Sequence, residues 1–214
     1  MRVVVNILSA KRVYAKEKIE DLNEKQIVPK MMLRRRLTRN AKIMLYLADA
    51  CEFEGGKIIY GSAFGELGAT VGITDAILND TPISPTLFQN SVYNSAPSYF
   101  SLLKGDKDEI ITLSNGMKTS KDVLSAAALQ ALESGEQVLA VCAESLNIER
   151  IDEVNRCTDY LESGGAVVLE VAKEQEGARE LELSTQEGII DSLNEMFSVV
   201  NMFEKGEKKL FIEL

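Results

Sequence analysis

Two short, almost uninterrupted apolar runs constrain the fold of this chain more than any other feature of its sequence. One run covers Gln137–Cys142 and the other covers Ala166–Val171. Strands buried on both faces of a sheet have this pattern, whereas a strand with one solvated face alternates apolar and polar residues. Segments with apolar residues at helical spacing alternate with further β-branched runs along the rest of the chain. This alternation predicts a layered α/β fold with a largely buried sheet.

The expected elements follow from the same patterns. Besides the two apolar runs, short β-branched segments predict strands at Val3–Leu8, Lys57–Tyr60, Glu109–Leu113 and Lys209–Glu213. Helical spacing or surface charge predicts helices over residues 12–24, 34–52, 71–77, 86–103, 119–132 and 189–203. The helix over 86–103 is expected to be mostly buried, and the spacing of Thr119 and Asp122 predicts a capping box.

Length and composition indicate one globular domain. The chain has 214 residues, of which 45% are apolar and 27% are charged, close to the average of folded proteins. No linker or repeat divides it, and no stretch approaches the roughly 20 apolar residues of a membrane span. The apolar run near the N-terminus is too short for a signal peptide, so we expect a cytoplasmic protein without a membrane span.

Charge and residue usage exclude several functions. The formal net charge is −9, which argues against nucleic acid as a partner. The sequence contains no histidine, so it has no imidazole base, no Ser-His or Cys-His dyad and no histidine-bound zinc. We expect no metal and no cofactor. Cys51, Cys142 and Cys157 lie far apart and are expected to be free thiols, with Cys142 and Cys157 structural rather than reactive.

A sharp turn follows the strand expected at Glu109–Leu113. Ser114, Asn115 and Gly116 occupy this turn, directly before the helix expected from Thr119. A strand-to-helix turn of this kind exposes one side chain beside the free N–H groups of a helix N-terminus, where nucleophiles are activated. A serine here would need a base that histidine cannot supply, and asparagine is not a common nucleophile. The turn therefore has the shape of an active site without its reagent.

Two other segments carry weaker signals. Gly61, Gly65 and Gly68 follow a strand and precede a helix, but their spacing matches no phosphate-binding motif, so a tight turn is the better interpretation. Residues 30–42 contain six basic and no acidic residues, whereas the rest of the chain has 18 basic and 33 acidic residues. This segment is either a solvated helix start or a docking surface for an acidic partner.

Several segments in register resemble the β-ketoacyl synthases, which have the thiolase-like fold. The run Ile111-Thr-Leu-Ser-Asn115-Gly-Met-Lys-Thr-Ser120, followed by an alanine-rich helix, is similar to the family's nucleophile elbow. Residues 84–96 resemble the segment ahead of the elbow, and residues 160–170 resemble the Gly-rich turn and strand that close the N-terminal half. Residues 32–37 and 64–67 are similar to landmarks of a short group of such domains, often labelled chain length factors. The resemblance covers about residues 30–172.

The resemblance implies a fold and a degenerate site. We expect a thiolase-like half in one domain: a five-stranded mixed sheet between helical layers, with residues 173–214 adding a C-terminal helix and strand. The family's catalytic cysteine aligns with Asn115, beside Ser114 and Gly116, and no counterpart of its two histidines is present. The resemblance therefore assigns no catalytic residue, and activity of this chain on its own is not expected.

The resemblance also implies partners. In this family the strand that leads into the elbow pairs across a dimer interface, so Ile111 and Leu113 are expected at or beside that edge. We expect a homodimer or a heterodimer with a ketosynthase. Acyl carrier proteins of such pathways are acidic, and Arg35, Arg36 and Arg39 are candidate docking residues. Arg35 and Arg39 are expected to share one helix face because they are four residues apart.

The preferred function is that of a non-catalytic, chain length factor-like protein of fatty-acid, polyketide or aryl-polyene synthesis. It would associate with a condensing enzyme, an acyl carrier protein, or both. One alternative is an acyltransferase or hydrolase that uses Ser114 or a free cysteine with an unrecognised base. Another is a purely structural, self-associating protein.

Overall fold

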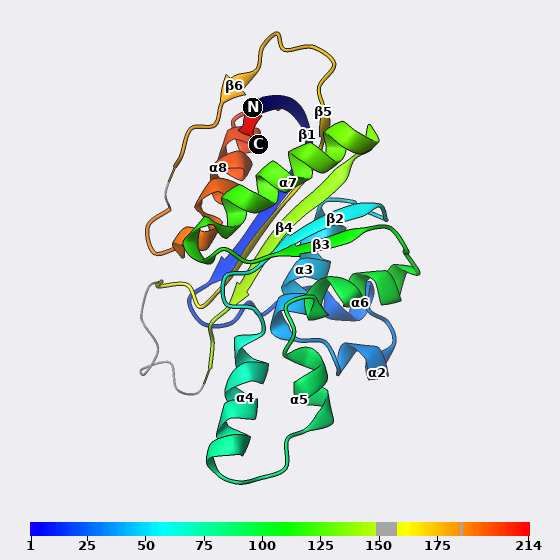
Figure 1. Cartoon of the computed structure of the whole chain (residues 1–214), viewed down its shortest axis with the longest axis vertical. Helices are drawn as coiled ribbons and strands as arrows, with labels where there is room; N and C mark the ends of the chain where they lie inside the picture. Colours follow the sequence, from blue (N-terminus) through cyan, green and yellow to red (C-terminus); the bar gives the residue numbers. More distant parts are fainter. Residues whose placement is uncertain (149–157, 185) are drawn as a thin grey trace.

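The computed structural model describes residues 1–148, 158–184 and 186–214 (Figure 1). The strands are β1 (Arg2–Ala15), β2 (Lys57–Gly61), β3 (Ile110–Leu113), β4 (Val138–Ser145), β5 (Glu162–Val171), β6 (Arg179–Glu180) and β7 (Lys209–Glu213). The α-helices are α1 (Glu24–Ile27), α2 (Met31–Arg34), α3 (Arg39–Ala50), α4 (Leu67–Leu78), α5 (Pro85–Asn90), α6 (Ser95–Lys104), α7 (Thr119–Ser134) and α8 (Asn194–Glu204). Two short 3₁₀ helices, η1 (Gly116–Lys118) and η3 (Asp191–Leu193), precede α7 and α8.

All strands of the described residues belong to one mixed sheet in the order β3-β2-β4-β5-β1-β7-β6. The strands β2, β3 and β4 run parallel, whereas β5 pairs antiparallel with both β4 and β1. The predicted α/β fold with a mixed sheet is confirmed, but the predicted number of five strands is wrong. Five strands form the body, β7 is the predicted C-terminal strand, and the two-residue β6 carries too few residues to give a sequence pattern.

Helices cover both faces of the sheet, as expected. One hydrophobic core joins α7 and α8 to the sheet through side chains such as Leu124, Met196 and Phe197. A second core on the opposite face joins α3 and α6 to the sheet through side chains such as Met44 and Phe100. In Figure 1, α7 and α8 lie together on one side of the strands and α3 and α6 on the other. The apolar runs in β4 and β5 reflect this burial on both faces.

Two adjacent glycines in β5 let the helices approach the sheet closely. A Cβ at Gly164 would lie 2.8 Å from Ile43 Cγ2 in α3 and 2.9 Å from the carbonyl oxygen of Cys142. A Cβ at Gly165, which faces the other way, would lie 2.7 Å from Met196 Cγ in α8. Because successive residues of a strand point to opposite faces, these two glycines bring both helical layers against β5.

The structure corrects the helix predicted over residues 12–24. Arg12–Ala15 instead continue β1, where Val13 pairs with Gly164 and Ala15 with Glu162. The charge in this segment reflects half-exposed strand positions: Arg12 donates to Asn201 and forms an ion pair with Glu204 at 2.9 Å. Helix α1 begins only at Glu24.

Two further helices differ from the sequence predictions. The helix predicted from residue 34 starts at Arg39, because Thr38 accepts a hydrogen bond from Ala41 N and caps it. The helix predicted over 86–103 is divided into α5 and α6, and only Asn90 of α5 is buried. In Figure 1, α4 and α5 project together away from the sheet, which explains the exposure of α5.

The capping box predicted at Thr119 is also wrong. The N-cap of α7 is Lys118, and the Thr119 hydroxyl accepts from Asn115 N and donates to the Gly116 carbonyl. Asp122 accepts from the Asn115 amide instead of from the helix backbone. The Thr119 and Asp122 side chains therefore stabilise the turn before the helix.

Within the described ranges, no helix is both long and apolar enough to cross a membrane.

The glycine positions generate a stability prediction. We expect Gly164→Ala to lower the free energy of unfolding by ~1–3 kcal/mol, because the new methyl group meets buried side chains and a backbone carbonyl. Gly68→Ala is the matched control, since its Cβ would meet nothing within 4 Å and its helical position favours alanine. Urea unfolding measures both changes. Equal stability of the Gly164→Ala variant and the parent protein would contradict the close packing.

Candidate functional site

The turn between β3 and α7 lies where the sequence predicts the degenerate elbow. Asn115 precedes η1, and Gly116 adopts a positive φ of 51°, which glycine reaches without steric cost. The N-terminus of α7 packs tightly against the end of β2: a Cβ at Gly61 would lie 2.5 Å from Val123 Cγ2 and 2.8 Å from Thr119 Cγ2. This contact fixes the turn relative to the parallel strands.

The Asn115 side chain is held by the first turns of α7. Its Nδ2 donates to Asp122 Oδ2 at 2.7 Å, and its backbone N–H donates to Thr119 Oγ1 at 3.0 Å. An amide in this position can donate or accept hydrogen bonds, but it does not form acyl-enzyme intermediates. The turn therefore carries no common nucleophile at residue 115, and the correspondence of Asn115 to the family's catalytic cysteine stays a prediction.

The thiols of the described residues are poorly suited to nucleophilic chemistry. Cys51 and Cys142 are both free and buried. Burial raises the pKa of Cys51 to about 11, and burial followed by the nearby Glu144 raises the pKa of Cys142 well above its ordinary value. Cys157 lies outside the described residues. Ser114 is exposed at the turn.

A buried carboxylate lies behind the elbow. Glu144, at the end of β4, accepts hydrogen bonds from Ser62 Oγ at 2.8 Å, Ala63 N at 2.5 Å and Ser192 Oγ at 3.1 Å. The N–H of Ser62 in turn donates to the carbonyl of Leu113 at the end of β3. Glu144 therefore joins the turn after β2 to η3, and the backbone of the same turn is bonded to the end of β3.

Burial is the main cause of the raised pKa of Glu144. Desolvation raises the pKa of Glu144 to about 7, although four hydrogen-bond donors oppose the shift. Glu66, four residues after Ser62, accepts from Thr38 Oγ1 at 2.8 Å, and burial raises its pKa to about 7 as well. Sequence reasoning missed both residues. The available signal was a glutamate at the end of an apolar strand, since buried glutamates are rare unless they are bonded.

The turn with Gly61, Gly65 and Gly68 is organised around these two carboxyl groups. Gly65 has a positive φ of 59° and packs against the Tyr93 ring, whereas Gly61 belongs to β2 and Gly68 to α4. The backbone N–H groups of Ala63 and Phe64 are directed at Glu144. Because a protein carboxylate already occupies these donors, the geometry favours the tight-turn interpretation over a phosphate loop.

The three docking candidates do not lie on one helix face. Helix α2 ends at Arg34 and α3 begins at Arg39, so the expectation that Arg35 and Arg39 share a face is wrong. Arg39 forms two hydrogen bonds with the buried Glu162, at 2.6 and 2.5 Å, and is joined by Glu24 at 3.6 Å. Arg35 and Arg36 are exposed. The role of any of the three in docking stays a prediction.

The strand that leads into the elbow, β3, forms one edge of the sheet. β3 pairs with β2 only, and its other side has no partner among the described strands. Ile111 and Leu113 lie on this strand with partly buried side chains that pack against the α7 side of the core. Their place in a dimer interface stays a prediction.

In the described part of the chain, no group of three or more Cys, Asp and Glu side chains is arranged so that it could hold a metal ion.

Comparison with known proteins places this geometry in a family. Residues 10–211 match the family described as "Beta-ketoacyl synthase, N-terminal domain". The chain belongs to this family. The comparison with curated protein sequences gave no match.

Three solved structures have folds similar to that of this chain. One is a chain of the structure described as "Ketosynthase (ApeO) in Complex with its Chain Length Factor (ApeC) from Xenorhabdus doucetiae". It is 21% identical, with a TM-score of 0.62 over 79% of this chain and 80% of that chain. A type II polyketide synthase complex, AntDE:AntF, described as an acyl-carrier protein with its ketosynthase, is 13% identical, with a TM-score of 0.62 over 81% and 64%. The ishigamide ketosynthase/chain length factor is 13% identical, with a TM-score of 0.59 over 81% and 63%. The chain therefore shares its fold with these chains. It spans less than two thirds of the latter two chains.

The arginine geometry generates a second prediction. We expect Arg39→Ala to lower the free energy of unfolding by ~3–5 kcal/mol, because the buried Glu162 would lose its charge partner. Arg35→Ala removes the same charge from an exposed position and should change stability by less than ~0.5 kcal/mol. Chemical denaturation measures both. Equal stability of the two variants would show that Arg39 is not structural.

The buried carboxyl groups generate a third prediction, on pH. Glu144 and Glu66 have a pKa of 4.5 in the unfolded chain, whereas burial raises the pKa of each to about 7 in the folded protein. Between these values the unfolded state binds fewer protons, so the free energy of unfolding falls as pH rises, by roughly 2–3 kcal/mol per group. The double variant Glu144→Gln with Glu66→Gln should show a much flatter dependence from pH 5 to 8. An unchanged slope would contradict the assignment, whatever the variant's absolute stability.

Proposed function

We propose that this protein is a non-catalytic, chain length factor-like subunit that acts by pairing with a condensing enzyme of fatty-acid, polyketide or aryl-polyene synthesis. The observation that carries the proposal is the elbow itself. A strand-to-helix turn is formed where the resemblance places the family's cysteine, but its residue is Asn115, which is bonded to Asp122. Selection for the fold without its chemistry fits a subunit whose contribution is its surface.

The open edge of β3 supports pairing. The carbonyl groups of Glu109 and Leu113 accept from β2, so the alternate residues Ile110 and Thr112 direct their backbone groups away from the sheet. Such an edge invites a strand from another chain. Leu102 in α6, before β3, and Met117 in η1, after it, are large exposed apolar side chains on the flanking elements.

The similar structures agree with this assembly. Two of them are described as a ketosynthase with its chain length factor, and another as an acyl-carrier protein with its ketosynthase. By analogy, the proposed partner is a ketosynthase, and an acidic acyl carrier protein is a further partner. Arg35 and Arg36 are the docking residues that we retain for the carrier protein, since Arg39 is engaged with Glu162. The proposed place of action is the cytoplasm.

The experiment is pairwise coexpression of the tagged chain with each ketosynthase of its source genome. We expect one of them to copurify in a defined complex, because the β3 edge is completed by its partner. The chain alone should take up no label from acyl- or malonyl-loaded carrier protein, whereas the complex should be labelled on the ketosynthase. A chain alone that sediments as a homodimer would favour the self-associating alternative.

Thr112→Pro tests the interface. Proline removes the N–H that faces away from β2, and proline is tolerated at sheet edges, so we expect at least tenfold weaker pairing with little change in melting temperature. Thr112→Val is the matched control, because it keeps both the N–H and the β-branched shape. Failure to bind any ketosynthase, or labelling of the isolated chain that Ser114→Ala abolishes, would refute the proposed function.

A further inference from the structure

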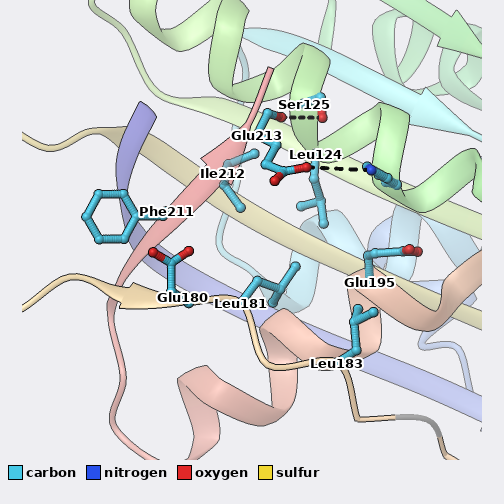
Figure 2. A pocket seen from close by; sticks show the side chains of 10 residues that line it. Leu124, Ser125, Glu180, Leu181, Leu183, Glu195, Phe211, Ile212 and Glu213 are labelled. Atoms are coloured by element: carbon cyan, nitrogen blue, oxygen red, sulfur yellow. Dashed lines mark hydrogen bonds and ion pairs between the residues drawn. The ribbon is translucent and has the colours of Figure 1, made fainter. Parts of the chain in front are cut away.

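An apolar pocket lies between the first turns of α7, the β6–β7 pair and the start of α8. Its apolar lining includes Leu124, Leu181, Phe211 and Ile212 (Figure 2). Leu183, on the segment after β6, also lines the pocket although its side chain is 65% exposed. A leucine that remains exposed beside a recess of apolar side chains has unused packing surface. The strands β6 and β7, which line the pocket, lie at the opposite edge of the sheet from β3.

Carboxylates from three elements surround this lining. Glu180 belongs to β6, Glu195 to α8 and Glu213 to β7, and all three line the pocket. Figure 2 shows them on different sides of the leucines. Lys121 is the basic residue that lines the pocket, and its Nζ lies 3.7 Å from Glu213. Arg2 is paired with Glu180, and its Cζ lies 4.6 Å from the centroid of the Phe211 ring. Three carboxylates therefore face two cations, and the rim keeps a net negative charge.

The charge of the whole chain is concentrated in the segment that forms this rim. Residues 158–214 contain 13 acidic and 5 basic residues, whereas residues 1–148 contain 17 of each. The existing pairs are solvent-exposed: Glu180 with Arg2 at 2.6 Å, and Glu213 with Lys121. Exposed pairs contribute little stability and can exchange partners at small cost.

We propose that this pocket docks a basic amphipathic helix of a protein partner. The apolar side chains of such a helix would pack on Leu181, Leu183 and Phe211, while its Lys or Arg side chains would reach Glu180, Glu195 and Glu213. A ligand with one cation could satisfy only one of the three carboxylates, which come from separate elements. A helix carries several cations flanking one apolar stripe. An acidic carrier protein is repelled by the same rim.

The probe is a short synthetic helical peptide with a leucine stripe and lysines on its remaining faces, labelled for fluorescence anisotropy. The full chain should bind it, with affinity that falls as salt rises, and should not bind a twin in which every lysine is glutamate. The double variant Glu180→Gln with Glu213→Gln should weaken binding at least fivefold. Leu183→Ser, at an exposed position that does not endanger folding, should weaken it to a similar degree.

Matched controls separate this pocket from general attraction to an acidic protein. Glu133→Gln with Glu136→Gln changes the net charge equally at the far end of α7, and Leu132→Ser removes an exposed leucine there. Both should leave binding within twofold of the parent chain. Equal weakening by pocket and control variants, or no binding of the lysine peptide, would overturn the proposal.

Two other occupants are outcomes of the same experiment. Tighter binding of dodecylammonium than of the peptide at this pocket would replace the helix with a single-cation amphiphile and overturn the proposal. Self-association of the intact chain that Arg35→Ala with Arg36→Ala abolishes would replace the partner with a second copy, and would equally overturn it. The proposal does not depend on pairing with a ketosynthase, because the probe requires no ketosynthase and the variants lie away from β3.

Discussion

The antiparallel pairing of β4 with β5 is the constraint on which the rest of the structure depends. It runs without interruption from the Val138–Leu169 pair to the Ser145–Glu162 pair, and it is buried on both faces. The parallel strands β2 and β3 add to its β4 side, and β1, β7 and β6 add to its β5 side. Because Gly164 and Gly165 remove side-chain bulk from β5, the helices of both layers close directly on this pair. The arrangement leaves almost no space for volume changes at its centre.

The two carboxylates at the end of this pairing extend its influence to the loops. Glu144 accepts hydrogen bonds from the turn after β2 and from η3, whereas Glu162 accepts them from Ile19 N and the Arg39 guanidinium. A buried carboxylate lowers the stability of the fold unless hydrogen-bond donors surround it. Both residues therefore depend on the loops that bring these donors to the end of the sheet. The hydrogen bonds of Glu144 and Glu162 therefore hold the loops at this end of the sheet, next to strands whose own packing is apolar.

Much of this fold is readable from sequence because its central strands are buried on both faces. The apolar runs identify β4 and β5, and turn residues mark the ends of α4 and β3. The charged continuation of β1 through Arg12 was misread as a helix, since its partners Asn201 and Glu204 lie about 190 residues away. For the same reason no local pattern shows that Arg39 serves Glu162.

The candidate site was predictable only as far as local geometry reaches. The strand-to-helix turn can be read from consecutive residues, whereas the assignment of Asn115 to the family's cysteine position comes from the resemblance and stays a prediction. The contribution of Glu144 and Glu66 cannot, because their pKa shifts arise from burial by elements that are distant in sequence. The pocket beside α7 combines residues from four separated segments, so its apolar lining and acidic rim emerge only in the folded chain.

The position of β1 has a consequence for how this protein is made. Its two neighbours are β5 and β7, and Val5 pairs with both Val171 and Leu210. β1 therefore leaves the ribosome well before the two strands that pair with it, and both of its edges stay open until they follow. Contacts of such long sequence separation slow folding, because a large loop must close before they form. The nascent chain is thus open to misassembly from the synthesis of β1 until that of β7.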